Sequence, residues 1–199
     1  MSTRETADVR RQSLIDAAAA SLAQEGVGGT SVRSICARAG VSPGLLTHYF
    51  SGIDALIAAT YRDVTARVAT RLDEAAAQAG SDPRARIQAF INASFGPPIA
   101  DPALLATWLA FWSLVKTDPA IAAIHRETYR GYRDRLQLLL VACGLDPGEA
   151  GPVAIALTAL VDGLWLELSL DPTSFTPAEA GVIARRWLET LLERPRLTS

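Results

Sequence analysis

Residues 30–50, TSVRSICARAGVSPGLLTHYF, contain two short amphipathic segments separated by a turn. The first segment is predicted to begin at Thr30 or Ser31, because either side-chain oxygen can cap a helix. Gly40 can end it, since glycine adopts the left-handed conformation without a Cβ penalty. Between these positions the apolar residues recur at i, i+3, i+4 and i+7, which predicts one buried helix face: Val32, Ile35, Cys36 and Ala39.

The second segment begins directly after the turn, with Ser42 as the predicted N-cap. Pro43 then occupies the first helical position, where its missing N–H costs nothing. Leu46 and Phe50 are four residues apart and should face the first helix, which leaves small, uncharged residues on the outside. A helix with such a bare N-terminal face can enter a DNA major groove closely, and its free N–H groups favour phosphate. The two segments therefore predict a helix-turn-helix.

The same residues resemble the DNA-binding domain of TetR-family transcriptional regulators. The resemblance extends over about twenty residues and rests on this set: Ile35, Ala39, Gly40, Val41, Ser42, Gly44, Leu46, His48, Tyr49 and Phe50. The family commonly has Tyr where this chain has Thr47 and Lys where it has Ile53, and both usually contact phosphate. Thr47 keeps a hydroxyl, but Ile53 has no donor and is left out of the predicted site. An ordinary helical hairpin is the alternative interpretation.

The predicted DNA contacts follow from the motif. Hydroxyl and imidazole groups of the second helix should donate to phosphates, while its small N-terminal residues reach base edges or a thymine methyl. Leu45 could read DNA or pack inward. The complete predicted set is Ser31, Arg33, Ser42, Pro43, Gly44, Leu45, Thr47, His48 and Tyr49.

The composition fits a buried helical core with apolar surface left for a partner subunit, because 49% of the 199 residues are hydrophobic and 20% are charged. The net charge of −2 is not typical of a nucleic-acid-binding protein. Residues 1–50 carry five arginines and four acidic residues, so their charge has the sign that DNA requires but is small. The prediction of DNA binding therefore depends on the motif.

No pattern in the sequence indicates an enzyme, a metal site or a cofactor. We find no nucleophile with a base, no carboxylate pair and no phosphate-binding glycine loop. Cys36 and Cys143 fall inside separate predicted helices, where small buried hydrophobic residues are the favoured interpretation. His48 and His125 are too few to complete a zinc site. The N-terminus has no apolar signal segment, which predicts a cytoplasmic protein.

Helix boundaries are marked along the whole chain. A first helix should run from about Asp8 to Glu25. Ser51-Gly52 should break the chain, and a long helix should follow to about Ala79. Asp-Pro pairs then predict helices near 83–95, 102–116, 119–143 and 147–170, and Thr176 with Glu179 forms a capping box for a last helix. The predicted fold is all-α with about nine helices. We predict a helix-turn-helix domain over 1–52 and a ligand-binding and dimerisation domain over 53–199.

Residues 152–170 are apolar around most of the predicted helix. A membrane span is the alternative, but Asp162 and Glu167 lie inside the segment, and an acidic residue at the bilayer centre costs about 2.5–3.5 kcal/mol. A helix buried between a core and a second subunit is favoured. The TetR resemblance implies that the last two helices pair with their copies in a homodimer. The predicted interface consists of Leu160, Leu164, Ile183, Ala184, Trp187, Leu188 and Leu191.

Aromatic residues in TWLAFW (107–112) and LVDGLWLELSL (160–170) resemble the C-terminal domain of the BetI-like branch, which is associated with sensing choline-type and other amines. Tryptophan faces attract cations, and Asp162 could complete a cationic site. Alternatively the tryptophans fill the core, and Asp162 is paired with an arginine or a donor such as Thr158. The predicted ligand site contains Phe95, Trp108, Phe111, Trp112, Tyr129, Asp162 and Trp165.

These inferences predict a homodimeric TetR-type repressor that binds a palindromic, double-stranded DNA operator and is released by a small molecule, for which a cationic amine is one hypothesis. No membrane partner and no cofactor are expected. The alternative function is a helical dimer or adaptor protein that does not bind DNA. It would not explain why a bare helix face is combined with Ser42 and Thr47.

Overall fold

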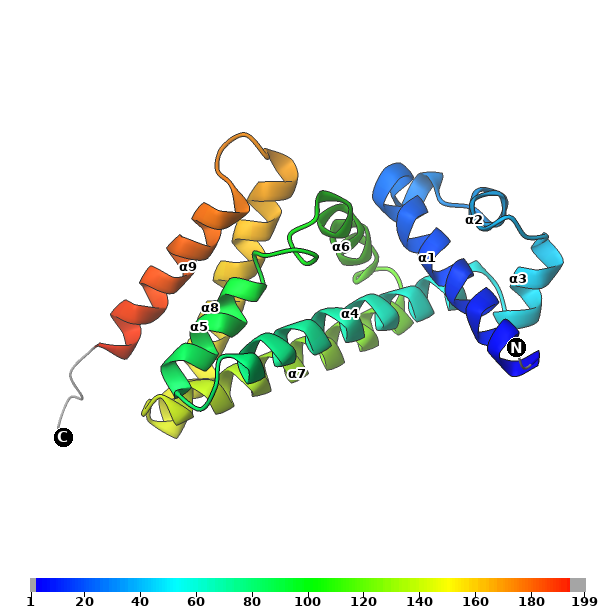
Figure 1. The fold of residues 1–199 in the computed structure, drawn as a ribbon. Helices are drawn as coiled ribbons and strands as arrows, with labels where there is room; N and C mark the ends of the chain where they lie inside the picture. Colours follow the sequence, from blue (N-terminus) through cyan, green and yellow to red (C-terminus); the bar gives the residue numbers. More distant parts are fainter. Residues whose placement is uncertain (1–2, 194–199) are drawn as a thin grey trace. The chain divides into compact units, whose positions relative to one another are not determined.

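The computed structural model describes residues 3–193, and within this range the chain forms nine helices and no strand (Figure 1). The all-α prediction is confirmed. The helices are α1 (Thr3–Gly29), α2 (Val32–Ala39), α3 (Pro43–Tyr49), α4 (Ile53–Gln78), α5 (Pro83–Ala93), α6 (Pro102–Leu114), α7 (Pro119–Ala142), α8 (Pro147–Leu170) and α9 (Pro177–Leu192).

The chain divides into two compact units. The first contains the residues up to 67 together with 102–126, and the second contains 68–101 together with the residues from 127 onward. The division falls inside α4 and α7, so each of these long helices contributes to both units.

Side-chain caps start the helices where the Asp-Pro pairs predict them. The carboxylates of Asp82, Asp118 and Asp146 accept hydrogen bonds of 2.7–3.2 Å from backbone N–H groups two or three residues further on. Thr176 and Glu179 form the predicted reciprocal capping box at the start of α9. These bonds satisfy N–H groups that have no partner inside the helix.

Gly26 ends the regular part of α1. Its backbone is non-helical, with φ 65° and ψ −175°, which only glycine adopts without strain. The Thr30 hydroxyl donates to the Gly26 carbonyl at 2.7 Å and holds the chain as it turns toward α2. The predicted end of the first helix near Glu25 is therefore confirmed.

The core of the first unit joins α1, α2, α3 and the start of α4. Its buried residues are Leu14, Ile15, Ala17, Ala18, Ile35, Cys36, Leu46, Phe50 and Leu56. A second aromatic group in this unit surrounds Tyr61, which is fully buried. The Phe111 ring stacks on Tyr61 at 4.2 Å, Trp108 meets it edge-on at 6.0 Å, and the Tyr61 hydroxyl lies 3.1 Å from Nδ1 of His125.

The second unit packs α9 against α5 and α8. Along α8, one face is buried and carries Ala154, Leu157, Thr158, Val161, Trp165 and Leu168. Among the described helices, α8 alone is long and apolar enough to cross a membrane by length and composition, and 33% of its most apolar window is buried. Nε1 of Trp165 donates to the Ser94 carbonyl at 2.9 Å, so the buried face of α8 packs on protein.

Candidate functional site

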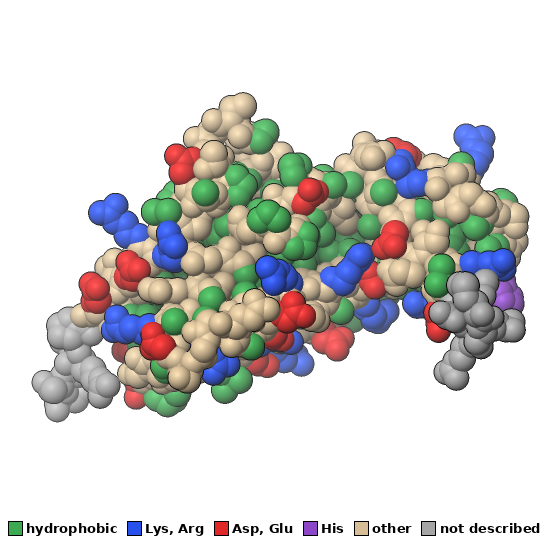
Figure 2. All heavy atoms as spheres, in the orientation of Figure 1, with side chains coloured by type: hydrophobic (Ala, Val, Ile, Leu, Met, Phe, Trp, Pro, Cys, Tyr) green, Lys and Arg blue, Asp and Glu red, His purple; other side chains and the backbone are tan. Residues whose placement is uncertain are grey.

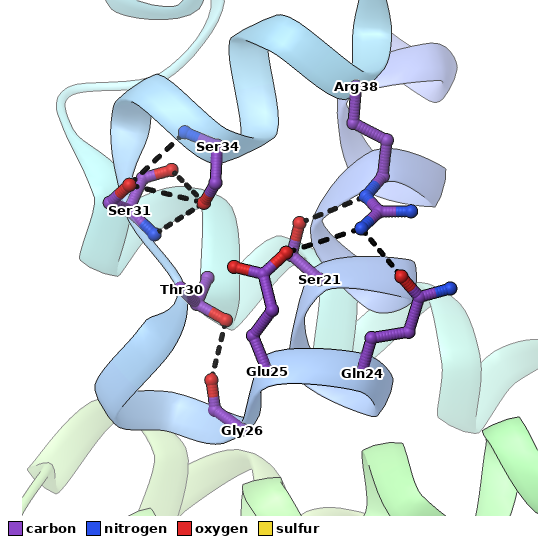
Figure 3. Close-up of polar contacts among 8 residues, drawn as sticks. All are labelled: Ser21, Gln24, Glu25, Gly26, Thr30, Ser31, Ser34 and Arg38. Atoms are coloured by element: carbon purple, nitrogen blue, oxygen red, sulfur yellow. Dashed lines mark hydrogen bonds and ion pairs between the residues drawn. The ribbon is translucent and has the colours of Figure 1, made fainter.

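A capping box starts α2. Ser31 is the N-cap, and its hydroxyl accepts from the Ser34 N–H at 3.1 Å, while the Ser34 hydroxyl accepts from the Ser31 N–H at 2.9 Å (Figure 3). At the other end Gly40 is left-handed, with φ 65°. The predicted start and end of this helix are confirmed.

Two arginines of α2 have different surroundings. Arg38 reaches from α2 to the last regular turns of α1, where its guanidinium donates to Ser21, Gln24 and Glu25 at 2.8–3.2 Å (Figure 3). Arg33 is exposed and makes no ion pair with any side chain between residues 7 and 193. Arg38 therefore fixes α2 against α1, whereas the charge of Arg33 is available to an external phosphate.

Helix α3, the candidate recognition helix, packs on the core of the first unit through one buried face. Leu46 is fully buried and Phe50 almost so, as the four-residue spacing predicts. Ser42 is the N-cap with extended backbone, but its hydroxyl caps none of the described N–H groups, and Pro43 follows at the first helical position. The buried face anchors the helix and leaves the Ser42 hydroxyl available for other donors or acceptors.

The predicted DNA-contacting residues lie on α2 and α3 or directly before them, and most of them are exposed. Leu45 and Tyr49 are partly buried, and Tyr49 packs against the core with its ring edge-on to His48 at 5.0 Å. Figure 2 shows basic side chains and a histidine on the surface over α1, α2 and α3. The remaining members of the set are exposed: Ser31, Arg33, Ser42, Pro43, Gly44, Thr47 and His48.

Gly44 leaves the first turn of α3 without a side chain. A Cβ placed on Gly44 would meet only the Ser42 hydroxyl, at 3.9 Å, among the described residues. The Thr47 hydroxyl donates back to the Gly44 carbonyl at 3.0 Å, so the donor that the sequence predicted for a phosphate is already used within the helix. Ile53 packs partly against the core, which agrees with leaving it out of the site.

A polar cluster in the second unit contains Asp162 of α8 and two residues of α7. The Tyr129 hydroxyl donates to the partly buried Asp162 carboxylate, and the charge of Arg133 acts on the same carboxylate. The guanidinium carbon of Arg133 lies 5.7 Å from the centre of the Tyr129 ring. Burial raises the pKa of Asp162 from 3.8 to about 6, and the Tyr129 hydrogen bond and the Arg133 charge limit this rise.

Thr158 is not the partner of Asp162, although it lies one turn earlier on α8. Its hydroxyl donates to the Ala154 carbonyl at 2.6 Å, inside the same helix. Sequence reasoning missed Arg133, because the partner comes from a different helix. The available signal was the four-residue spacing of Tyr129 and Arg133, which places both on one face of α7.

Two further residues of the second unit border this cluster. Burial raises the pKa of Tyr132, the neighbouring Ser94 side chain limits this rise, and the Tyr132 ring lies 5.4 Å from Phe90. Trp165 is bonded to the Ser94 backbone, next to the buried Phe95. Of the predicted ligand residues, Phe95, Tyr129, Asp162 and Trp165 thus lie in the second unit.

The other predicted ligand residues lie in the first unit. Trp108 and Phe111 pack on Tyr61, and Trp112 is partly buried on α6. The interpretation of Trp108 and Phe111 as core residues therefore has direct support from their packing. Among the side chains that the structure describes, residues 7–193, no group of His, Cys, Asp or Glu could hold a metal ion.

The predicted dimer interface requires a correction on α9. Ala184 and Leu188 are fully buried within the subunit, so they have no exposed surface to offer a partner and are removed from the interface. Ile183 is 45% exposed, and Leu160, Leu164, Trp187 and Leu191 are partly buried. Figure 2 shows hydrophobic side chains at the surface over α8 and α9, among charged ones. Further exposed apolar residues are Ile155, Leu166, Leu170 and Val182.

A helix-turn-helix unit linked to a separate helical unit defines the class of one-component DNA-binding regulators. Residues 14–60 match the model of bacterial regulatory proteins of the tetR family, and residues 83–193 match the BetI-type transcriptional repressor C-terminal domain. The chain belongs to the TetR family, with a BetI-type C-terminal domain, and is a transcriptional regulator rather than an enzyme.

Individual relatives agree with this assignment. The HTH-type transcriptional regulator BetI of Burkholderia thailandensis is 34% identical over 93% of this chain and 94% of its own length. A putative transcriptional regulator from Pseudomonas aeruginosa PAO1 has 41% identity and a TM-score of 0.84, covering 94% of this chain and 92% of that one. A putative regulator from Saccharomonospora viridis, solved in complex with choline, shares the fold at 16% identity and a TM-score of 0.79, covering 90% and 95%.

Proposed function

We propose that this repressor acts in the cytoplasm as a homodimer, that it binds a palindromic operator through α3, and that a small molecule bound in the second unit releases it. The exposed, bare N-terminal face of α3 carries the DNA part of the proposal. Pro43 and Gly44 present no long side chain, and the Ser42 and His48 side chains are exposed beside them. Such a face allows the helix backbone to approach base edges closely.

The exposed apolar residues of α8 and α9 support the homodimer. Ile155 and Val182 are each about half exposed, at 53% and 50%, which is unusual for large aliphatic side chains in a chain of 199 residues. A two-fold pairing of these helices would bring the same patch of both subunits together. Two recognition helices about 34 Å apart would then meet successive major grooves, which explains a palindromic operator.

Release by an effector requires two arrangements of the dimer with different affinities for the ligand. A molecule that binds the arrangement unable to hold DNA shifts the population toward it, and one that binds both equally shifts nothing. The partly buried Asp162, with the Tyr129 hydrogen bond and the charge of Arg133 acting on it, supports an effector site in the second unit. A choline complex in a protein of the same fold supports a small effector.

Selection of genomic DNA fragments by the purified protein, followed by sequencing, tests the proposal. Recovery of one palindromic sequence with two equivalent half-sites is the expected result. A purely structural helical dimer or adaptor would retain no sequence above background, and that outcome would refute the DNA part. Sedimentation of the protein with the selected duplex measures whether two subunits bind together.

A further inference from the structure

Helix α3 lacks the side chains that distinguish bases by hydrogen bonding. Its seven residues, PGLLTHY (43–49), include no Arg, Lys, Asn, Gln, Asp or Glu. Arginine, lysine, asparagine and glutamine donate to base edges in the major groove, and the acidic side chains accept from cytosine. A sequence preference of α3 must therefore come from another kind of contact.

The polar groups at and near α3 do not replace these side chains. The Thr47 hydroxyl already donates to the Gly44 carbonyl at 3.0 Å, and Tyr49 packs partly against the core. His48 lies in the last turn, whereas a recognition helix contacts base edges through its first residues. The Ser42 hydroxyl can pair with a donor or an acceptor, so it distinguishes bases poorly.

Leu45 and Leu46 are neighbours in different environments. Leu46 is fully buried and belongs to the core of the first unit. Leu45 is only partly buried, and it is not among the described apolar side chains that pack against this core. Part of the Leu45 side chain thus remains in water, and an apolar group from outside the chain would remove that surface from solvent.

The residues before Leu45 allow DNA to approach it. Pro43 is exposed and has no side-chain donor, and Gly44 has no side chain. Among the groups that base pairs present in the major groove, the 5-methyl group of thymine is the apolar one. An aliphatic side chain such as Leu45 complements that methyl group and no other feature of a base edge.

We propose that Leu45 is the main specificity-determining residue of α3, and that it selects one thymine in each operator half-site through contact with the 5-methyl group. The inference rests on the proposed function, because it requires α3 to lie in the major groove. Phosphate contacts, such as one from the exposed Arg33, position the helix and carry no sequence information. The methyl group, rather than the hydrogen-bonding pattern of the base pair, is then what the protein reads.

Two modified bases separate these kinds of readout in the operator obtained by genomic selection. Deoxyuridine keeps the hydrogen-bonding edge of thymidine but lacks the methyl group. 5-Methylcytosine paired with guanine keeps the methyl group but replaces the O4 acceptor with an amino donor. Each thymine is replaced at equivalent positions of both half-sites, with unmodified cytosine as the control, and fluorescence anisotropy measures the affinity of the full-length protein.

The affinity should depend on the methyl group at one thymine of each half-site. Deoxyuridine there should lower the affinity about fourfold for each half-site, and about tenfold or more for both. Adding the 5-methyl group to cytosine at the same position should recover a similar factor. Hydrogen-bond readout gives the reverse result, with deoxyuridine harmless and 5-methylcytosine as weak as cytosine, and that result overturns the proposal.

Two substitutions of Leu45 provide the matched comparison. Leu45→Ala should bind the thymidine and deoxyuridine operators equally, because the contact with the methyl group is lost in both. Leu45→Met keeps a long apolar side chain and should keep the preference for thymine. Thermal unfolding verifies that both variants fold, and an undiminished preference for thymine in folded Leu45→Ala contradicts the role of Leu45.

The outcomes distinguish this inference from the proposed function. If the protein selects a palindromic operator whose affinity no deoxyuridine substitution lowers, the DNA-binding function stands and the inference about Leu45 fails. If the genomic selection returns no operator, the proposed function fails, and the inference fails with it.

Discussion

The surface of α2 and α3 and the Asp162 cluster are built in opposite ways. The first presents exposed side chains that lie close together in the sequence, above a core that includes Leu46 and Phe50. The second joins α7 to α8 through partly buried polar groups, with a hydrogen bond from Tyr129 to Asp162. Substitution on the first surface should therefore change function alone, whereas substitution in the second should change ligand response and stability together.

The largest expected effect separates DNA binding from folding. Gly44→Leu should lower operator affinity by about a hundredfold or more, because the new side chain prevents close approach to the groove. The fold should be retained, since a Cβ at Gly44 meets only the Ser42 hydroxyl at 3.9 Å. Electrophoretic mobility shifts and thermal unfolding measure the two properties. Ala66→Leu, at an exposed position of α4, is the matched control and should bind normally.

Neighbouring residues of α9 should respond differently to the same charge. Ile183→Glu places a carboxylate at an exposed position and should give folded monomers with weak operator binding. Ala184→Glu buries a carboxylate without a partner and should destabilise the subunit by several kcal/mol. Sedimentation velocity and circular dichroism distinguish the outcomes. Folded dimers of Ile183→Glu would show that the interface lies elsewhere.

Asp162 should make stability depend on pH. Its carboxyl titrates near 3.8 when unfolded and near 6 when folded, so the folded chain binds the proton more tightly between these values. The free energy of unfolding therefore falls as pH rises from about 4 to about 6, by at most about 3 kcal/mol. The free energy of unfolding of Asp162→Asn should not fall over this pH range, because the amide does not titrate. Denaturant unfolding of both proteins at several pH values should show a difference that grows toward neutral pH and then levels off.

The two arginines of α2 give the smallest and most selective pair of effects. Arg33→Ala should reduce the slope of log operator affinity against log salt concentration by about one, because one fewer counterion is released. The stability of the protein should not change. Arg38→Ala removes the bonds to Ser21, Gln24 and Glu25 and should lower the free energy of unfolding by about 1 kcal/mol. A salt dependence that Arg33→Ala does not change would remove Arg33 from the DNA-contacting set.

The sequence predicted those features that depend on neighbouring residues. The caps at Ser31, Asp82 and Thr176 and the left-handed Gly40 each involve residues at most a few positions apart, and the structure confirms them. The inward faces of α2 and α3 followed from periodicity for the same reason. Local hydrogen bonding and steric limits determine such features, so they can be read without knowing the tertiary fold.

Features that depend on pairing between distant helices were not predictable in this way. Periodicity indicated two apolar stripes on α9 but not that the stripe with Ala184 and Leu188 faces the subunit's own core. The partner of Asp162 was uncertain because Arg133 lies on another helix. The packing of Trp108 and Phe111 on Tyr61 likewise requires knowing that α6 lies beside α4.

The brevity of α3 has a consequence for how tightly the operator is held. The helix has seven residues and one fully buried side chain, Leu46, while isolated helices shorter than about 12 residues are marginal in water. Packing against the core therefore keeps α3 helical. Its amide hydrogens should exchange with solvent faster than those of α1. In the proposed complex the operator should slow this exchange, and part of the interaction energy would then be consumed in ordering α3.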